Sequence, residues 1–161
     1  MSSKKLIVII ALLLSGLAAG AAVQEGGRLP DLTKMGLKGT LPATAGKVVL
    51  VDFWASWCGP CKQSFPALER LHEKYGKRGL VIVAVSVDED ADAMQEFLDA
   101  HPVSFAVVHD AQQRLVEATE VEAMPTSFLI GKDGKVAVVH TGFKGDETEE
   151  QIAIEIEGLL K

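Results

Sequence analysis

Cysteine is scarce in this sequence of 161 residues, which contains only two, Cys58 and Cys61. Both fall in the stretch SWCGPCKQSF, where Gly59 and Pro60 separate them. A crosslink between such close residues closes a minimal loop and removes little entropy from the unfolded chain. The scarcity therefore argues against a framework of structural disulfides. A reactive pair or a metal-binding pair remains to be distinguished.

Basic residues are also few, with 16 lysines and arginines against 22 aspartates and glutamates, and a net charge of -6. The sequence shows no basic patch within this acidic balance. Binding to nucleic acid depends on basic residues that neutralise phosphates, so an acidic domain is poorly suited to it. We therefore expect no nucleic-acid partner.

Metal ligands are equally sparse. A tetrahedral structural zinc site needs more ligands than a single Cys-x-x-Cys pair supplies. The acidic run at 88–92 lacks the glycine and the distant glutamate of a calcium-binding loop. No histidine shows ligand spacing to another, and the four are His72, His101, His109 and His140. The sequence therefore predicts neither a metal site nor a bound cofactor.

Residues 1–22 differ in composition from the rest of the chain. Two lysines precede an apolar run from Leu6 to Ala19, and small residues follow up to Ala22. A charged start, a short apolar run and a small-residue cleavage site are typical of a secretory signal peptide. An uncleaved membrane anchor is the alternative, because the run is near the lower limit for a spanning helix. Either interpretation predicts a periplasmic or other extracytoplasmic location.

The remaining chain divides into an N-terminal extension at 23–46 and a working domain at 47–161. In the extension, LPDL at 29–32 is interpreted as a short edge segment. In the domain, strand and helix patterns alternate. Runs rich in β-branched residues predict buried strands at 47–54, 79–88 and 103–110.

Helices are expected between and after these strands. The first begins near Cys58 and contains Pro66, which should kink it. Others are expected after a cap at Asp88 or Asp90, at 111–119, and at the C-terminus after an Asp146 cap with Glu149.

A hairpin with Asp133 and Gly134 in its turn precedes the last helix. This order of elements predicts an α/β fold, with a mixed central sheet covered by helices on both of its faces.

The two cysteines fit the chemistry of disulfide exchange. Cys58 follows a predicted strand at the start of a helix, where unpaired N–H groups and the helix dipole favour a thiolate. A thiolate is the attacking species in disulfide exchange. Cys61 lies one turn further on and can attack a mixed disulfide on Cys58, which releases the substrate. We interpret Cys58 as the nucleophile and Cys61 as the resolving residue.

Asp52 stands six residues before Cys58, inside an otherwise apolar strand. A buried lone carboxylate is costly, so its pKa should be raised toward neutrality. Such a group suits proton transfer, and we expect Asp52 to deprotonate Cys61. The simpler alternative is a carboxylate at a strand end near solvent.

Two segments resemble the thioredoxin family. VDFWASWCGPCK resembles its active-site segment, followed by Pro66 where that fold has a helix-kinking proline. AMPTSFLI at 123–130 resembles its cis-proline segment. The resemblance implies a thioredoxin fold and a cis bond before Pro125. It also implies a surface that contacts the substrate, formed by Trp57, Gly59, Pro60, Met124, Pro125 and Thr126.

Further features resemble the extracytoplasmic TlpA/ResA-like thiol:disulfide oxidoreductases within that superfamily. These are the leader, the LPDL lead-in, and an extra strand and helix between VSVD and FAVVHDA. Ser64 and Asp52 depart from this branch, which often carries Glu and Asn at these positions. VIVAVSV also lacks the lysine that thioredoxins place beside their buried Asp.

The resemblance also implies a direction and partners. The Gly-Pro dipeptide between the cysteines is similar to the reducing members of the family. The implied partners are proteins with disulfides, and a membrane electron donor of the DsbD/CcdA type that would keep the dithiol reduced. A role in cytochrome c maturation is one option, beside a copper-site protein or a broad set of disulfides. A monomer is expected.

Two alternatives to this function are kept open. A peroxiredoxin-like peroxidase would need a Thr-x-x-Cys loop, where this chain has Trp57 directly before Cys58. A thiol-dependent metal carrier or folding adaptor would use the same cysteine pair for binding instead of catalysis.

Overall fold

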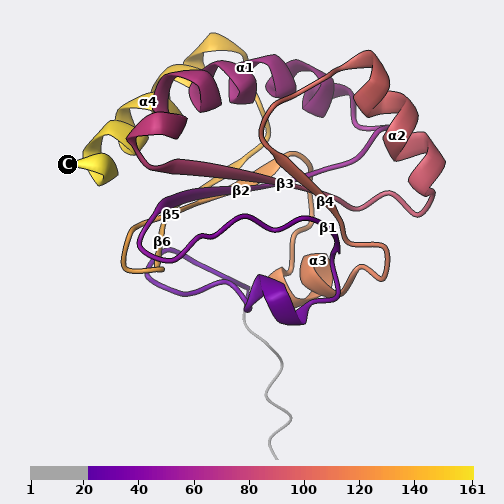
Figure 1. Ribbon diagram of the computed structural model, residues 1–161, viewed down its shortest axis with the longest axis horizontal. Helices are drawn as coiled ribbons and strands as arrows, with labels where there is room; N and C mark the ends of the chain where they lie inside the picture. Colours follow the sequence, from indigo (N-terminus) through magenta and orange to yellow (C-terminus); the bar gives the residue numbers. More distant parts are fainter. Residues whose placement is uncertain (1–21) are drawn as a thin grey trace, which may run out of the picture.

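A six-stranded sheet runs through the centre of the computed structural model, which describes residues 22–161 (Figure 1). The signal peptide or anchor predicted at 1–22 therefore lies, except for Ala22, outside the described residues. Among residues 22–161, no helix is long and apolar enough to cross a membrane. The strands are β1 (Lys38–Gly39), β2 (Val48–Trp54), β3 (Leu80–Ser86), β4 (Ala106–His109), β5 (Thr126–Ile130) and β6 (Val136–Thr141).

The sheet is mixed, with the strand order β1-β4-β3-β2-β5-β6. β2, β3 and β4 are parallel to one another, whereas β5 pairs antiparallel with both β2 and β6. β2 is therefore a central strand with a partner on each side. As a consequence, the end of β2 and the start of β5 lie at the same edge of the sheet, with Phe53 opposite Thr126.

Helices cover both faces of the sheet, as predicted. Figure 1 shows α1, α2 and α4 on one face, and α3 with the N-terminal segment on the other. Of the extra strand and helix expected between VSVD and FAVVHDA, the structure has the helix, α2; the next strand, β4, lies within FAVVHDA itself. The helices are α1 (Gly59–Tyr75), α2 (Ala91–Ala100), α3 (Arg114–Thr119) and α4 (Asp146–Leu160), with short 3-10 turns at Leu32–Lys34 and Gly76–Arg78.

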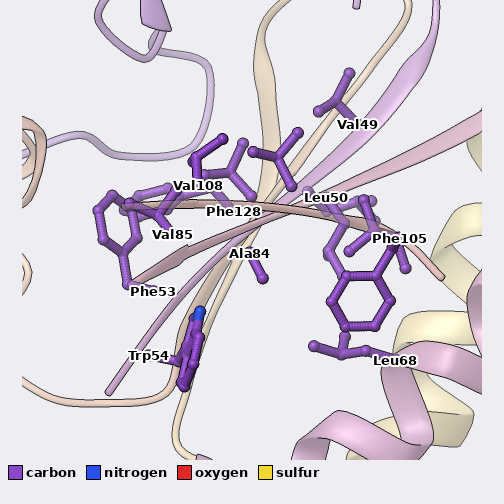
Figure 2. Close-up of a cluster of buried hydrophobic side chains, with 14 of the residues drawn as sticks. Val49, Leu50, Phe53, Trp54, Leu68, Ala84, Val85, Phe105, Val108 and Phe128 are labelled. Atoms are coloured by element: carbon purple, nitrogen blue, oxygen red, sulfur yellow. The ribbon is translucent and has the colours of Figure 1, made fainter. Parts of the chain in front are cut away.

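The core forms because β2 is buried along its whole length. All seven of its residues are buried, as expected for an apolar strand enclosed by helices on both faces. On the α1 side, Phe65 packs against Trp54 and Phe97 with ring centroids 4.6 and 5.0 Å apart. Figure 2 shows side chains of β2, β3, β4 and β5 gathered with Leu68 of α1.

The N-terminal extension differs from the prediction. LPDL is not an edge strand; Asp31 instead caps the 3-10 turn at Leu32–Lys34 by accepting a hydrogen bond from the Thr33 N–H. The edge strand is β1, which lies further along the chain and pairs antiparallel with β4. A short polar side chain that can satisfy a nearby N–H favours such a turn over an extended segment.

The start of α4 was predicted wrongly, whereas one of the two caps proposed for α2 is confirmed. Asp146 is the first residue of α4 and not its cap, because Gly145 occupies the cap position without a side-chain hydrogen bond. Glu149 reaches across to Arg70 of α1, forming an ion pair in place of the expected capping box. In the loop after β3, Asp90 caps α2, whereas Asp88 turns toward another part of the chain.

We predict that Phe65→Ala lowers the free energy of unfolding by about 3–5 kcal/mol. Phe65 is 1% exposed and contacts three aromatic rings, so its removal leaves a cavity in the core. Urea unfolding monitored by circular dichroism measures the loss. Ile154→Ala is the matched control, because Ile154 is 65% exposed and its truncation should change stability by less than about 0.5 kcal/mol. Equal losses in both variants would contradict the prediction.

Candidate functional site

The junction between β2 and α1 holds both cysteines. Cys58 occupies the cap position of α1 and forms a disulfide with Cys61, with their Cα atoms 5.3 Å apart. The backbone N–H of Cys61 donates a hydrogen bond to Cys58 Sγ at 3.2 Å. The sequence placed Cys58 at a helix start, and this placement is confirmed. The sulfur of Cys58 therefore meets the donor end of the helix.

The residues around Cys58 form the outer surface of this junction. Trp57 is 69% exposed, the largest exposed apolar side chain among residues 22–161. Gly59 and Pro60 occupy the first positions of α1 and are also exposed. A Cβ added to Gly59 would meet no atom within 4 Å, so the fold leaves open space above this turn. A large partner can therefore approach the disulfide from this side.

The loop before β5 lies at the same edge of the sheet. The Met124–Pro125 bond is cis, as the resemblance implied. The Pro125 carbonyl accepts a hydrogen bond from the Gly142 N–H at 2.7 Å, and Thr126 Oγ1 donates to the Ala123 carbonyl at 2.7 Å. Internal hydrogen bonds thus fix the end of this loop that leads into β5.

Trp57 and Met124 also line a common groove of about 470 Å³ with residues of α3. The structure therefore brings the Trp57 side of the cysteine turn together with the loop that carries Pro125 and Thr126, although the two segments are far apart in the sequence. Their use in binding a substrate is addressed below as a proposal.

Asp52 is buried within β2, with 1% of its surface exposed. Ser127 Oγ donates a hydrogen bond to Asp52 Oδ1 at 2.5 Å, whereas Oδ2 has no partner among residues 22–161. Burial raises the pKa of Asp52 to about 7, and the hydrogen bond from Ser127 partly opposes this shift. The simpler alternative, a carboxylate near solvent at a strand end, is therefore wrong.

The position of Asp52 relative to the cysteines follows from the alternation of β2. Trp54 packs against Phe65 of α1, so residue 52, two positions earlier on the same strand, points to the same face. That face is covered by α1, which carries the fully buried Cys61. Asp52 and Cys61 thus occupy one layer, between the sheet and α1.

Sequence reasoning missed Asp88 as a site residue. Its buried carboxylate accepts hydrogen bonds from the Ser56 N–H, from Ser56 Oγ at 2.7 Å and from Ser86 Oγ at 2.8 Å. Ser56 directly precedes Trp57, so Asp88 fixes the turn that presents Cys58. The acidic sequence around Asp88 suggested only a helix cap, and no local pattern connects it with Ser56.

Two serines complete the surroundings of the pair. Ser127, the partner of Asp52, was not singled out from the sequence because it lies 75 residues away along the chain. Ser64 is buried in α1, and its hydroxyl donates to the Cys61 carbonyl at 3.0 Å. Within residues 22–161, no group of three or more potential ligands is arranged to hold a metal ion.

A model of the Redoxin family matches residues 18–154 of the chain. The chain is 35% identical over 167 residues to the thiol-disulfide oxidoreductase ResA of Bacillus thuringiensis, covering 96% of this chain and 92% of that protein. These matches extend well beyond the cysteine motif, which agrees with the resemblance noted in the sequence.

Solved structures of thiol:disulfide interchange proteins agree with these sequence matches. A crystal structure assigned as thiol:disulfide interchange protein DsbE from Chlorobium tepidum has a TM-score of 0.80 at 36% identity, covering 87% of this chain and all (100%) of that one. A thioredoxin family protein from Chlorobium tepidum TLS, with a TM-score of 0.68 at 20% identity over 88% of this chain and 100% of that one, shows the fold alone. The fold is thus thioredoxin-like, as expected.

We predict that Asp52→Asn gains stability relative to the native protein as the pH rises. The pKa of Asp52 is about 7 when folded and 3.8 for a free carboxyl, so between these values the folded state binds the extra proton. Stability of the native protein should therefore fall as pH rises through this window and level off above it. Asp52→Asn has no carboxyl at this position and therefore lacks this loss. Its free energy of unfolding minus that of the native protein should increase by about 4 kcal/mol between about pH 4 and about pH 8.

Urea unfolding of the oxidised proteins at both pH values measures this gain. Asp99→Asn serves as the control, because Asp99 is exposed and should follow the native pH dependence. If Asp52→Asn also followed the native curve, Asp52 would be ionised at acidic pH in the folded protein, contrary to the structure.

Proposed function

The chain belongs to the Redoxin family and is a ResA-like thiol:disulfide oxidoreductase, and we propose that it acts mainly as a reductase of protein disulfides. The observation that carries this proposal is the arrangement around the cysteine pair. Cys58 heads a helix beside the exposed Trp57, Gly59 and Pro60 and keeps 5% of its surface exposed, whereas Cys61 is fully buried in the same layer as a carboxyl group that titrates near neutral pH. A nucleophile that reaches the surface and a protected resolving thiol are what a two-step exchange needs.

The reaction starts from the dithiol form. The Cys58 thiolate attacks one sulfur of the substrate disulfide, which forms a mixed disulfide and releases the other substrate sulfur as a thiolate. Cys61 then gives its proton to Asp52 and attacks Cys58, which breaks the mixed disulfide and releases the second substrate sulfur as a thiolate. Two electrons pass from the dithiol to the substrate, and the Cys58–Cys61 disulfide remains.

The reducing direction is supported by what surrounds Cys58. Strongly oxidising members of such enzymes owe their potential to a stabilised reduced form. Here the intervening Gly59 and Pro60 have no side-chain donors. In the described part of the chain, one hydrogen bond reaches Cys58 Sγ, from the Cys61 N–H. Modest stabilisation of the thiolate keeps the dithiol a good electron donor.

The substrate segment would lie along the surface shared by the cysteine turn and the cis-proline loop. Trp57 supplies an exposed aromatic face, and Met124 lines the same groove. Pro125 and Thr126 are themselves buried and support this surface from beneath, where the loop enters β5. Gly59 and Pro60 leave room above the disulfide. An extended peptide on this surface would bring its disulfide to Cys58.

The location and the electron supply form part of the proposal. Residues 1–22 support export, either as a cleaved signal peptide or as an anchor, ahead of an extension at 23–46 and the domain at 47–161. A dithiol outside the cytoplasm meets an oxidising environment and cannot stay reduced unaided. A membrane electron donor of the DsbD/CcdA type would restore it, and its substrates would be disulfides of exported proteins, including those of cytochrome c maturation.

We predict that Cys61→Ser accumulates a mixed disulfide with a protein substrate. The variant keeps the nucleophile Cys58 but cannot resolve the intermediate, so turnover of insulin under dithiothreitol should fall by about 100-fold or more. Non-reducing electrophoresis with mass spectrometry detects the adduct on Cys58. Cys58→Ser is the matched control and should form no adduct.

Full turnover by Cys61→Ser would contradict the two-step exchange. Peroxide consumption by the native protein without an added reductase would instead support the peroxidase alternative. Stoichiometric Cu(I) or Zn(II) binding without insulin reduction would support a metal carrier.

We predict that Trp57→Ala discriminates between large and small substrates. Truncation of an aromatic residue central to a binding surface commonly costs more than about 1 kcal/mol, so kcat/KM for insulin should fall by about tenfold. Oxidised glutathione is too small to depend on this contact, and its kcat/KM should change by less than about twofold. An equal loss for both substrates would place the role of Trp57 in the chemistry instead of in binding.

A further inference from the structure

Asp52 has one side-chain partner, and that partner comes from the neighbouring strand. The register of β2 and β5 places Ser127 directly opposite Asp52, and the same register on the other side places Ala84 of β3 there. Both polar residues are buried, Asp52 at 1% and Ser127 at 6% exposure. The hydroxyl of Ser127 donates to Oδ1, so one oxygen of the carboxylate is held and the other, Oδ2, is left without a partner among residues 22–161.

Charged groups do not compensate Asp52 within the described chain. Neither β3 nor β5 contains a titratable residue, and no ion pair within residues 22–161 includes Asp52. Most of the groups on the other elements packed around this layer have partners of their own. In α1, Cys61 is in the disulfide and Tyr75 is bonded to Glu157 of α4. His72 of α1 packs its ring against Phe105, and its Nδ1 has no hydrogen-bond partner among residues 22–161. On β6, beyond Ser127, His140 is bonded to Glu155 of α4, and in the loop after β3 Asp88 is bonded to Ser56.

We propose that Ser127 is a positioning residue for the reaction, whose hydroxyl holds Oδ1 of Asp52 and leaves Oδ2 as the atom that takes the proton from Cys61. This inference rests on the proposed role of Asp52 as proton acceptor. In the resolving step, the proton leaves Cys61 Sγ for Oδ2, and the electron pair of the thiolate forms the bond to Cys58. The bond between Cys58 and the substrate breaks, and the substrate thiolate leaves.

A hydroxyl has a particular advantage at this position. It donates to the ionised carboxylate, which favours that form, but it adds no charge to a buried layer. A cation there would hold the carboxyl ionised well below neutrality and make it a poor proton acceptor. With Ser127, burial remains the dominant influence and the pKa of Asp52 is about 7. The serine thus keeps the carboxyl balanced between its two forms near neutral pH.

The experiment compares Ser127→Ala with Ser127→Thr. Loss of the hydroxyl should raise the pKa of Asp52 by about one pH unit, as measured in the oxidised protein by carbon NMR of the labelled carboxyl. The rate of resolution should then be about fivefold lower than native at pH 7 and should converge with native near pH 9. Ser127→Thr retains the donor and should restore both the pKa and the rate.

The controls separate this inference from the proposed function. Thr119→Val removes another buried hydroxyl without changing volume, in α3 on the opposite face of the sheet, and should leave the pKa of Asp52 unchanged (Figure 1). His140→Gln tests whether a shift in the pKa of Asp52 originates from the neighbouring histidine. Adding Ser127→Ala to His140→Gln should raise the pKa of Asp52 by the same amount as adding it to the native protein.

The outcomes are distinct. An unchanged carboxyl pKa in Ser127→Ala, or a failure of Ser127→Thr to restore it, would overturn the role of Ser127 even if Asp52→Asn abolishes the pH dependence of the rate. If Asp52→Asn leaves that pH dependence intact, the proposed role of Asp52 itself fails, whatever the NMR titration shows.

Discussion

The pairing of β2 with a neighbour on each side is the constraint on which the rest of the site depends. Because β3 and β5 both bond to β2, every residue of β2 is buried, including Asp52. The same pairing sets Ser127 opposite that carboxyl and brings the start of β5 to the edge where β2 ends. The cysteine turn and the cis-proline loop therefore meet without any direct sequence connection. A register shift by one residue would turn Asp52 away from α1 and separate it from Cys61.

Stability and chemistry make opposite demands on this strand. A buried carboxyl without a cation is unfavourable for folding at neutral pH, and the surrounding aromatic core must offset it. The proposed proton transfer from the buried Cys61 to Asp52 gains from the same feature, because a group that titrates near neutrality can both accept and release a proton. A second buried carboxylate, Asp88, accepts hydrogen bonds from hydroxyl and backbone donors and holds the cysteine turn in place. Asp52 has a single side-chain donor, so the two buried carboxylates differ in role because their hydrogen-bond partners differ.

Much of the fold was predictable because its signals are local. The apolar run at 47–54, the helix start at Cys58, the hairpin turn and the mixed sheet all follow from periodicity and turn residues, and the structure has them. The burial of Asp52 was also predictable from its apolar flanks. The partnership of Asp52 with Ser127, and of Asp88 with Ser56, was not, because each depends on the register or proximity of segments far apart in the chain. The Asp146 cap failed for a related reason, since Glu149 has a tertiary partner in Arg70.

The hydrogen bonds of Asp88 to Ser56 separate the cysteine turn into a buried inner side and an exposed outer side. The inner side holds the backbone through Ser56, and the Asp88 carbonyl in turn accepts a hydrogen bond from His109 at the end of β4. The outer side, which includes Trp57, Gly59 and Pro60, is exposed and contributes little to the core. Substitutions on the outer side can therefore accumulate without loss of the scaffold. If this surface contacts the substrate as proposed, changes of substrate range would arise from substitutions in one short exposed turn, while the buried hydrogen bonds of Asp88 stay the same.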